Sequence, residues 1–178
     1  IFAHAARGNL VFVGAAQGSR EGHAILVPAD SPIKTVADLK GQKVAFKRGS
    51  SAHYATIRLL ETAGLTLDDI TPQDLAPPDA IAAFDAGAIG AWTIWDPYFA
   101  MAEERPNTRV LRTTEGLEQD YNFYSANGDY AKENPELVAQ LVRTVQAVGQ
   151  KGQQDLDTTT RTFARETGLS EAVMHRFL

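Results

Sequence analysis

Short apolar segments alternate with an amphipathic segment in the first part of the chain, and this alternation constrains the fold more than any other feature. Three apolar runs of the strand type, at His23–Pro28, Lys43–Phe46 and Ala91–Trp95, are bounded by polar, Gly or Pro residues. Between the last two runs, Ser51–Ala63 carries apolar residues at three- and four-residue spacing, as on one face of a helix. Because parallel strands need a crossover connection, the alternation predicts an α/β fold with a mostly parallel sheet and helices on its faces.

Weaker patterns complete this outline. We expect a strand at Leu10–Gly14, a helical turn at Val36–Lys40, a strand at Gln73–Leu75, a helix capped by Asp79 and ending at Ala86 before Gly87, a helix opened by Pro97 and reaching about Glu104, and a strand at Thr108–Leu111. After Glu115 the pattern changes to one strand and then helix after helix. These are a strand at Asn122–Ala126, a helix begun by Asn134 and Pro135 with an apolar stripe of Leu137, Val138, Leu141, Val142, Val145 and Val148, and helices at Asp157–Thr167 and Ser170–Leu178.

Composition excludes several classes of function. A net charge of -5 and a pI near 5.3 argue against a nucleic-acid-binding protein, which needs a clustered basic surface. The chain has no cysteine, so disulfides, thiolate zinc sites and cysteine nucleophiles are excluded. No two of its four histidines lie at the i, i+4 spacing of a helical metal motif, and no apolar run is long enough to span a bilayer. We therefore expect no metal, no cofactor and no membrane segment within this sequence.

The segment AFKRGSSAHY, residues 45–54, is the best candidate for a binding site. A predicted strand leads through Lys47 and Arg48 into a Gly-Ser-Ser turn at the start of a predicted helix. Free backbone N–H groups and the positive end of the helix dipole converge there, and the hydroxyls of Ser50 and Ser51 add donors. Gly49 allows close approach of the backbone, so the pattern predicts a cradle for an oxyanion, which His53 also reaches from the first helical turn.

Other interpretations of the same residues remain open. The serines are equally suited to capping the helix while the basic side chains face water, and His53 is then surface filler. A hydrolase triad of Ser50, His53 and Asp96 is conceivable from residue types, but the G-x-S-x-G pattern is absent. Nucleotide-binding glycine patterns are absent too.

The segment AWTIWDPYF, residues 91–99, is the second candidate. Ligands of open α/β sheets bind outside the carboxyl ends of strands, where Trp95 is expected to lie. Trp95 also has the character of a core residue, and Asp96 is first of all a good cap before Pro97. We expect Asp96 to orient this loop and only secondarily to contact a ligand.

Three segments carry a resemblance to a known family: ILVPADSPIKTVADLKGQKVAFKRGSSAHY, AAFDAGAIGAWTIWDPYFA and NFYSANGDYAKENPELV. In order and spacing the chain resembles the aliphatic sulfonate-binding proteins of ABC importers, within the wider group that binds sulfonates, nitrate, taurine and thiamine precursors. The resemblance implies a type II periplasmic binding protein, in which two αβ lobes joined by hinge strands close over the ligand. It also implies that Gly49, Ser50, Ser51 and His53 line the anion site and that Trp95 forms part of its wall.

The resemblance sets the remaining expectations. Gln17 and Asn122 fall where the chain leaves and re-enters the first lobe, so both are counted as ligand contacts together with Asp96. The expected lobes are residues 24–114, inserted as a whole second lobe, and residues 1–23 with 115–178, a first lobe that is incomplete because family members begin earlier and end later. The chain is thus expected to be a fragment.

The implied function is capture of a small organic oxyanion, foremost an alkanesulfonate used in sulfur metabolism, and its delivery to the membrane permease of an ABC importer. The protein is expected to be a monomer in the periplasm or lipid-anchored on the outer face of the cytoplasmic membrane, with no enzymatic activity and no nucleic-acid partner. The alternatives are an enzyme of thiamine-precursor or related metabolism on the same fold, a nitrate or taurine binder, and a sensory domain of a signalling protein.

Overall fold

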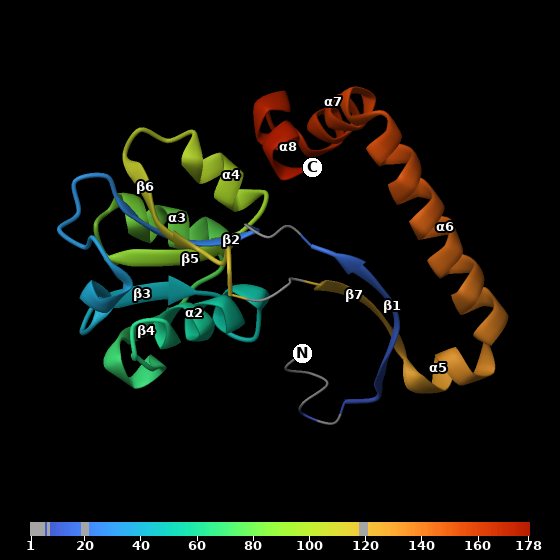
Figure 1. The fold of residues 1–178 in the computed structure, drawn as a ribbon, viewed down its shortest axis with the longest axis horizontal. Helices are drawn as coiled ribbons and strands as arrows, with labels where there is room; N and C mark the ends of the chain where they lie inside the picture. The colour runs from blue at the N-terminus through green and yellow to red at the C-terminus, as the bar shows by residue number, and fades with distance from the viewer. Residues whose placement is uncertain (1–5, 7, 19–21, 118–120) are drawn as a thin grey trace. The chain divides into compact units, whose positions relative to one another are not determined.

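The computed structural model describes residues 6, 8–18, 22–117 and 121–178, which form two compact units (Figure 1). One unit contains residues 22–117. The other combines residues 6 and 8–18 with residues 121–176. The assignment of these units to the two lobes of a binding protein, with bounds of 24–114 and of 1–23 with 115–178, stays a prediction.

The unit of residues 22–117 is built on a five-stranded sheet with the order β4-β3-β5-β2-β6. Its elements are β2 (His23–Pro28), the 3-10 turn η1 (Val36–Leu39), β3 (Lys43–Phe46), α2 (Ser51–Glu61), the 3-10 turn η2 (Leu67–Asp69), β4 (Thr71–Asp74), α3 (Pro77–Asp85), β5 (Ala91–Trp95), α4 (Tyr98–Glu103) and β6 (Thr108–Thr113). The strands and helices predicted for this region are all present, with ends shifted by a few residues.

The direction of β2 differs from the prediction of a mostly parallel sheet. The strand β3 runs parallel to both of its neighbours, β4 and β5, whereas β2 runs antiparallel to β5 and β6. Only β2 runs opposite to the other four strands, but two of the four strand pairings in this sheet involve β2 and are therefore antiparallel. A buried apolar strand satisfies its hydrogen bonds in either direction, so the run His23–Pro28 does not encode the orientation.

Helices cover both faces of this sheet, and alternate residues of each central strand enter different cores. In β3, Val44 and Phe46 pack with Leu59 and Leu60 of α2. Ala45, which points the other way, packs in a second cluster with α3 and α4. That cluster contains Ala24, Leu26, Ala45, Ala80, Phe84, Ile89, Trp92, Ile94, Phe99 and Ala102. Burial on both faces explains why these strands are apolar throughout rather than alternating.

One helix begins differently from the prediction. Asp79 was expected to cap α3, but the helix starts at Pro77 with Ala76 as its N-cap and no side-chain capping bond. Two consecutive prolines occupy the first helical positions, where a missing N–H costs nothing, so Asp79 lies inside the first turn. Gly87, with φ of 67°, ends the helix as expected.

The other unit pairs β1 (Leu10–Gln17) with β7 (Tyr121–Asn127) as an antiparallel ribbon. Helices follow as α5 (Gly128–Glu133), α6 (Pro135–Gln154), α7 (Leu156–Thr167) and α8 (Glu171–Phe177). Asn134 is the N-cap residue of α6 and Pro135 its first residue, as predicted. The apolar stripe of α6 is only partly covered, since Leu141 is 62% exposed and Val148 66% exposed.

Candidate functional site

The turn between β3 and α2 has the geometry expected of a helix-start anion site. β3 ends at Phe46, Gly49 takes a left-handed conformation with φ of 78°, and Ser50 is the N-cap of α2. A positive φ is open to glycine at little cost, and it turns the chain from the strand into the helix. The segment of residues 47–53 is called the cradle below.

The hydroxyl of Ser50 is occupied within the protein. Its Oγ donates to the Lys47 carbonyl oxygen at 2.6 Å and accepts from the His53 N–H at 3.4 Å. The interpretation of Ser50 as a helix cap is therefore confirmed. Because the hydroxyl both donates and accepts within the turn, the role that the structure shows for Ser50 is to shape that turn.

Ser51 and the first turn of α2 supply the available donors. Ser51 is exposed, and its hydroxyl makes no hydrogen bond within the part of the chain that the structure describes. The backbone N–H groups of Ser51 and Ala52 also have no acceptor among the described residues. The first N–H groups of a helix have no intrahelical partner and carry the positive end of its dipole. An oxyanion is the complementary guest for these groups.

His53 lies against the inner side of the turn. Its Nδ1 accepts the Gly49 N–H at 3.2 Å, and its ring stacks on Phe46 with centroids 5.1 Å apart and planes 9° from parallel. Burial lowers the pKa of His53 below 6.5, the nearby Arg48 lowers it further, and Asp74 opposes both effects. The neutral imidazole, with its proton on Nε2, is the form that this geometry holds.

Asp74, at the end of β4, ties the cradle to the sheet. Its Oδ1 accepts from Lys47 Nζ at 2.9 Å and from the Arg48 N–H at 3.0 Å. These donors, the Arg48 N–H foremost, lower the pKa of Asp74 below 3.8. The sequence did not single out Asp74, because its role depends on the parallel pairing that sets Phe46 beside it.

Trp95 and Asp96 lie at the same edge of the sheet as the cradle. The strands β3 and β5 are parallel neighbours, with Val44 beside Ala91, so their carboxyl ends emerge together. Trp95 is half-buried and meets the Tyr98 ring edge-on, with centroids 6.2 Å apart. The structure thus brings an apolar surface to the edge that carries the donors of α2.

Asp96 supports the start of α4, although the N-cap position of this helix is Pro97 and not Asp96 as expected. Its Oδ1 accepts the N–H of Ala100 at 3.1 Å in the first turn of α4, and its own N–H donates to the Gly22 carbonyl. With Ser50 bonded to Lys47 and His53 accepting from Gly49, these bonds do not form a Ser-His-Asp relay.

Gln17 and Asn122 lie in the other unit, on the β1–β7 ribbon. Asn122 pairs with Ala16 and Gln17 pairs with Tyr121, so the two predicted contacts are neighbours of each other on adjacent strands. Both are exposed. Their contact with a ligand stays a prediction.

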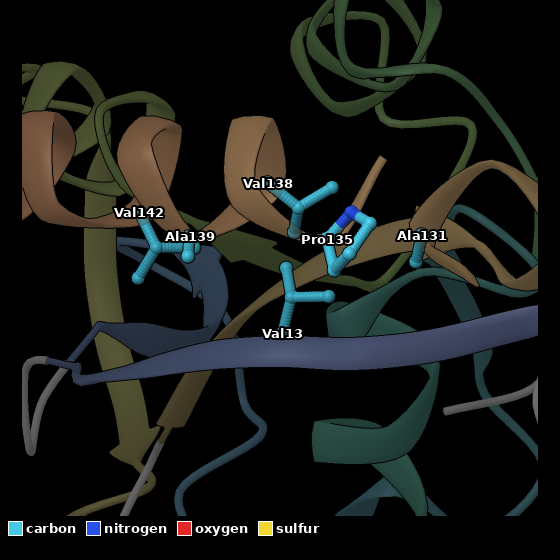
Figure 2. A pocket seen from close by; sticks show the side chains of 6 residues that line it. All are labelled: Val13, Ala131, Pro135, Val138, Ala139 and Val142. Carbon is cyan, nitrogen blue, oxygen red and sulfur yellow. The ribbon is translucent and has the colours of Figure 1, made fainter. Parts of the chain in front are cut away.

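An apolar groove in that unit is a poorer candidate. It has a volume of about 400 Å³ and lies between β1, α5 and α6 (Figure 2). The side chains that line it are Val13, Ala131, Pro135, Val138, Ala139 and Val142. A binding site for an anion needs convergent polar groups, and no side chain around this groove provides one.

Neither a metal site nor a membrane-spanning helix is found among the described residues. No group of three or more His, Cys, Asp or Glu side chains is placed to hold a metal ion there. None of the helices in the same part of the chain has the length and hydrophobicity needed to cross a membrane.

The fold and the cradle define the class of periplasmic binding proteins, and comparison with known proteins agrees. Residues 1–152 match the profile of the NMT1/THI5-like family, and the chain therefore belongs to it.

The alkanesulfonate-binding protein SsuA from Xanthomonas axonopodis pv. citri, in its crystal structure bound to MOPS, is 38% identical in sequence to this chain and matches its fold with a TM-score of 0.93. The match covers 99% of this chain and 61% of that one.

Two Escherichia coli proteins extend the comparison. The periplasmic aliphatic sulphonate binding protein SsuA is 39% identical with a TM-score of 0.87, over 99% of this chain and 57% of that one. The taurine-binding periplasmic protein of strain K12 is 25% identical over 130 residues, which is 71% of this chain and 40% of that protein. The chain spans 56% and 50% of the length of two curated relatives that it matches, from Escherichia coli and Bacillus subtilis.

Proposed function

We propose that residues 1–178 are part of an extracytoplasmic solute-binding protein that captures small organic oxyanions for an ABC importer, with aliphatic sulfonates as the main ligands. The observation that carries the proposal is the start of α2, where the N–H groups of Ser51 and Ala52 have no acceptor among the described residues. The resemblance to two SsuA proteins gives the ligand class.

In this proposal the sulfonate oxygens accept from the Ser51 and Ala52 N–H groups and from the Ser51 hydroxyl. Gly49, Ser50 and His53 shape the cradle around them through the bonds that they make to one another and to Lys47. Charge-assisted bonds of this kind are stronger than neutral ones, so the backbone and hydroxyl donors at the start of α2 suit an anion.

The organic tail is proposed to lie against Trp95. This side chain is half-buried at the sheet edge that carries the cradle, and its ring offers a large apolar surface. Asp96 supports the loop through its bond to Ala100. Gln17 and Asn122 remain proposed contacts of the other unit.

Capture rather than catalysis is favoured by the same geometry. His53 does not act as a base on Ser50, because its Nδ1 accepts from Gly49 and the Ser50 hydroxyl donates to Lys47. The sequence has no cysteine to serve as a nucleophile. An enzyme of thiamine-precursor metabolism therefore finds no support in the described residues.

The remaining features of the proposal follow from the relatives. We place the protein in the periplasm, free or lipid-anchored on the outer face of the cytoplasmic membrane, as a monomer that delivers its ligand to a membrane permease. Taurine is the second ligand to consider, because a taurine-binding relative is 25% identical to this chain.

Calorimetric titration of the protein that contains residues 1–178 tests the proposal. A series from methanesulfonate to butanesulfonate, with taurine and nitrate, is compared with dimethyl sulfone, a neutral control. We expect the alkanesulfonates to bind and the sulfone to fail. Each methylene buried against Trp95 is expected to add about 0.8 kcal/mol, roughly fourfold in affinity. Absence of binding by every oxyanion contradicts the proposal.

A further inference from the structure

The bond between Gly49 and His53 is the feature of the cradle that simple anion binding does not require. The Gly49 N–H, which a ligand-binding turn would be expected to present to the anion, donates instead to His53 Nδ1 at 3.2 Å. The imidazole is held for this task by its stack on Phe46, with ring planes 9° from parallel. Phe46 is 2% exposed and belongs to the core.

The geometry points to His53 as a positioning residue: by accepting the Gly49 N–H, its neutral imidazole fixes the left-handed Gly49 and thereby aims the N–H donors of Ser51 and Ala52. This inference rests on the proposed function of the cradle. It assigns His53 an indirect role, in contrast to the direct contact with the anion that the family resemblance implies.

Protonation is expected to release this arrangement. A neutral imidazole has one acceptor nitrogen, whereas the imidazolium ion has two donors and no acceptor. Once Nδ1 is protonated it is a donor, like the Gly49 N–H that it faces, and the hydrogen bond between them is lost. The turn then loses the contact that holds Gly49 at its φ of 78°.

The charges around His53 come from the turn and from β4. Arg48 in the turn disfavours the imidazolium, and Asp74 at the end of β4 favours it. Lys47 is ion-paired with the same Asp74 carboxylate at 2.9 Å, which weakens the influence of that carboxylate. Burial is the larger cause and acts in the same direction as Arg48, so the pKa of His53 lies below its ordinary value of 6.5.

The two roles of His53 predict opposite dependence on pH. If the imidazolium contacted the sulfonate directly, affinity would rise on acidification, because a cation would form beside the anion. If His53 positions the turn, affinity falls on acidification. Butanesulfonate is a suitable probe, since its own charge does not change between about pH 7.5 and pH 5.

The experiment compares the parent protein with His53→Asn and His53→Phe by calorimetry with butanesulfonate at both pH values. The Asn Oδ1 is placed much as Nδ1 is and accepts the Gly49 N–H without titrating, whereas Phe keeps the stack on Phe46 and lacks the acceptor. We expect affinity to fall severalfold on acidification in the parent, to stay nearly level in His53→Asn, and to be about tenfold weaker at both pH values in His53→Phe. His175→Asn, at an exposed position of α8, is the control and leaves affinity unchanged.

A second measurement separates failure of this inference from failure of the proposed function. The amide resonance of Gly49 is followed through the same pH range without ligand. Its chemical shift is expected to change as His53 titrates in the parent and to stay constant across the pH range in His53→Asn. If no oxyanion binds, the proposed function fails while the resonance still tests the bond. Three results would each overturn the inference. These are a Gly49 amide resonance that does not change as His53 titrates, a higher affinity at low pH, and full affinity in a folded His53→Phe variant.

Discussion

Ser50 both caps α2 and shapes the cradle through its bond to the Lys47 carbonyl oxygen. Ser50→Ala removes the cap of α2 and the bond to the Lys47 carbonyl, so we expect a loss of about 0.5–2 kcal/mol in unfolding free energy and weaker sulfonate binding. Ser170 caps α8 by accepting from the Val173 N–H at 3.1 Å, which makes Ser170→Ala a matched control. Urea unfolding and calorimetry measure both effects. Equal loss of affinity in the two variants would contradict the role given to the cradle.

Trp95 is distinguished from the other tryptophan by its position. Trp95→Phe removes part of the proposed tail surface, and affinity for butanesulfonate is expected to fall by about three- to tenfold, with a smaller change for methanesulfonate. Trp92 is 2% exposed in the core beneath α3 and α4, so Trp92→Phe should alter stability and leave affinity unchanged. A uniform loss across the sulfonate series in Trp95→Phe would speak against the tail contact.

Asp74 makes the stability of the fold around the cradle depend on pH. Its folded-state pKa lies below the ordinary value of 3.8, so ionisation of Asp74 contributes stability above that value. The contribution is lost as the pH falls through the lowered pKa. We expect Asp74→Asn to be less stable than the parent at neutral pH and to show a shallower decline below about pH 4, measured by unfolding at several pH values. Asp79→Asn, at the exposed first turn of α3, is the control.

Among the helices, α6 shows an apolar stripe that the rest of its unit leaves partly uncovered. Leu137, Leu141 and Val148 are 52%, 62% and 66% exposed. Apolar patches of this kind bind partners or cause self-association. For residues 1–178 produced alone, we expect dye binding and concentration-dependent association, both reduced by Leu141→Gln. Gln146→Ala, on exposed α6, serves as the control in light scattering. Unchanged association in Leu141→Gln would show that the stripe is not responsible.

The core is divided unevenly between the two units. Among the described residues, all but three of the buried apolar side chains belong to residues 22–117, the exceptions being Ala164, Val173 and Met174. Local stability follows buried apolar contact, so we expect hydrogen exchange to be slowest in β2, β3 and β5. Exchange in β1, β7 and α6 is expected to be faster by orders of magnitude. Uniform protection of both units would contradict this picture.

Much of the fold was predictable because its signals are local. The apolar run Lys43–Phe46, the helix periodicity after Ser51, and the glycines that end helices each act within a few residues of their own position. The cradle was predictable for the same reason: a strand, a Gly-Ser-Ser turn and a helix start are consecutive in the chain. The prediction that Asp79 caps α3 was wrong because two prolines move the start of this helix to Pro77.

Other features depend on residues that are distant in sequence. The direction of β2 follows from where the chain places β5 and β6 on either side of it, since an apolar strand pairs equally well both ways. Asp74 meets Lys47 across 27 positions, through the parallel register of β3 and β4. Residue types made His53 a candidate, but its tautomer and its bond to Gly49 came from the folded turn. Periodicity records what each segment buries, whereas partners across a sheet are chosen by packing on both of its faces.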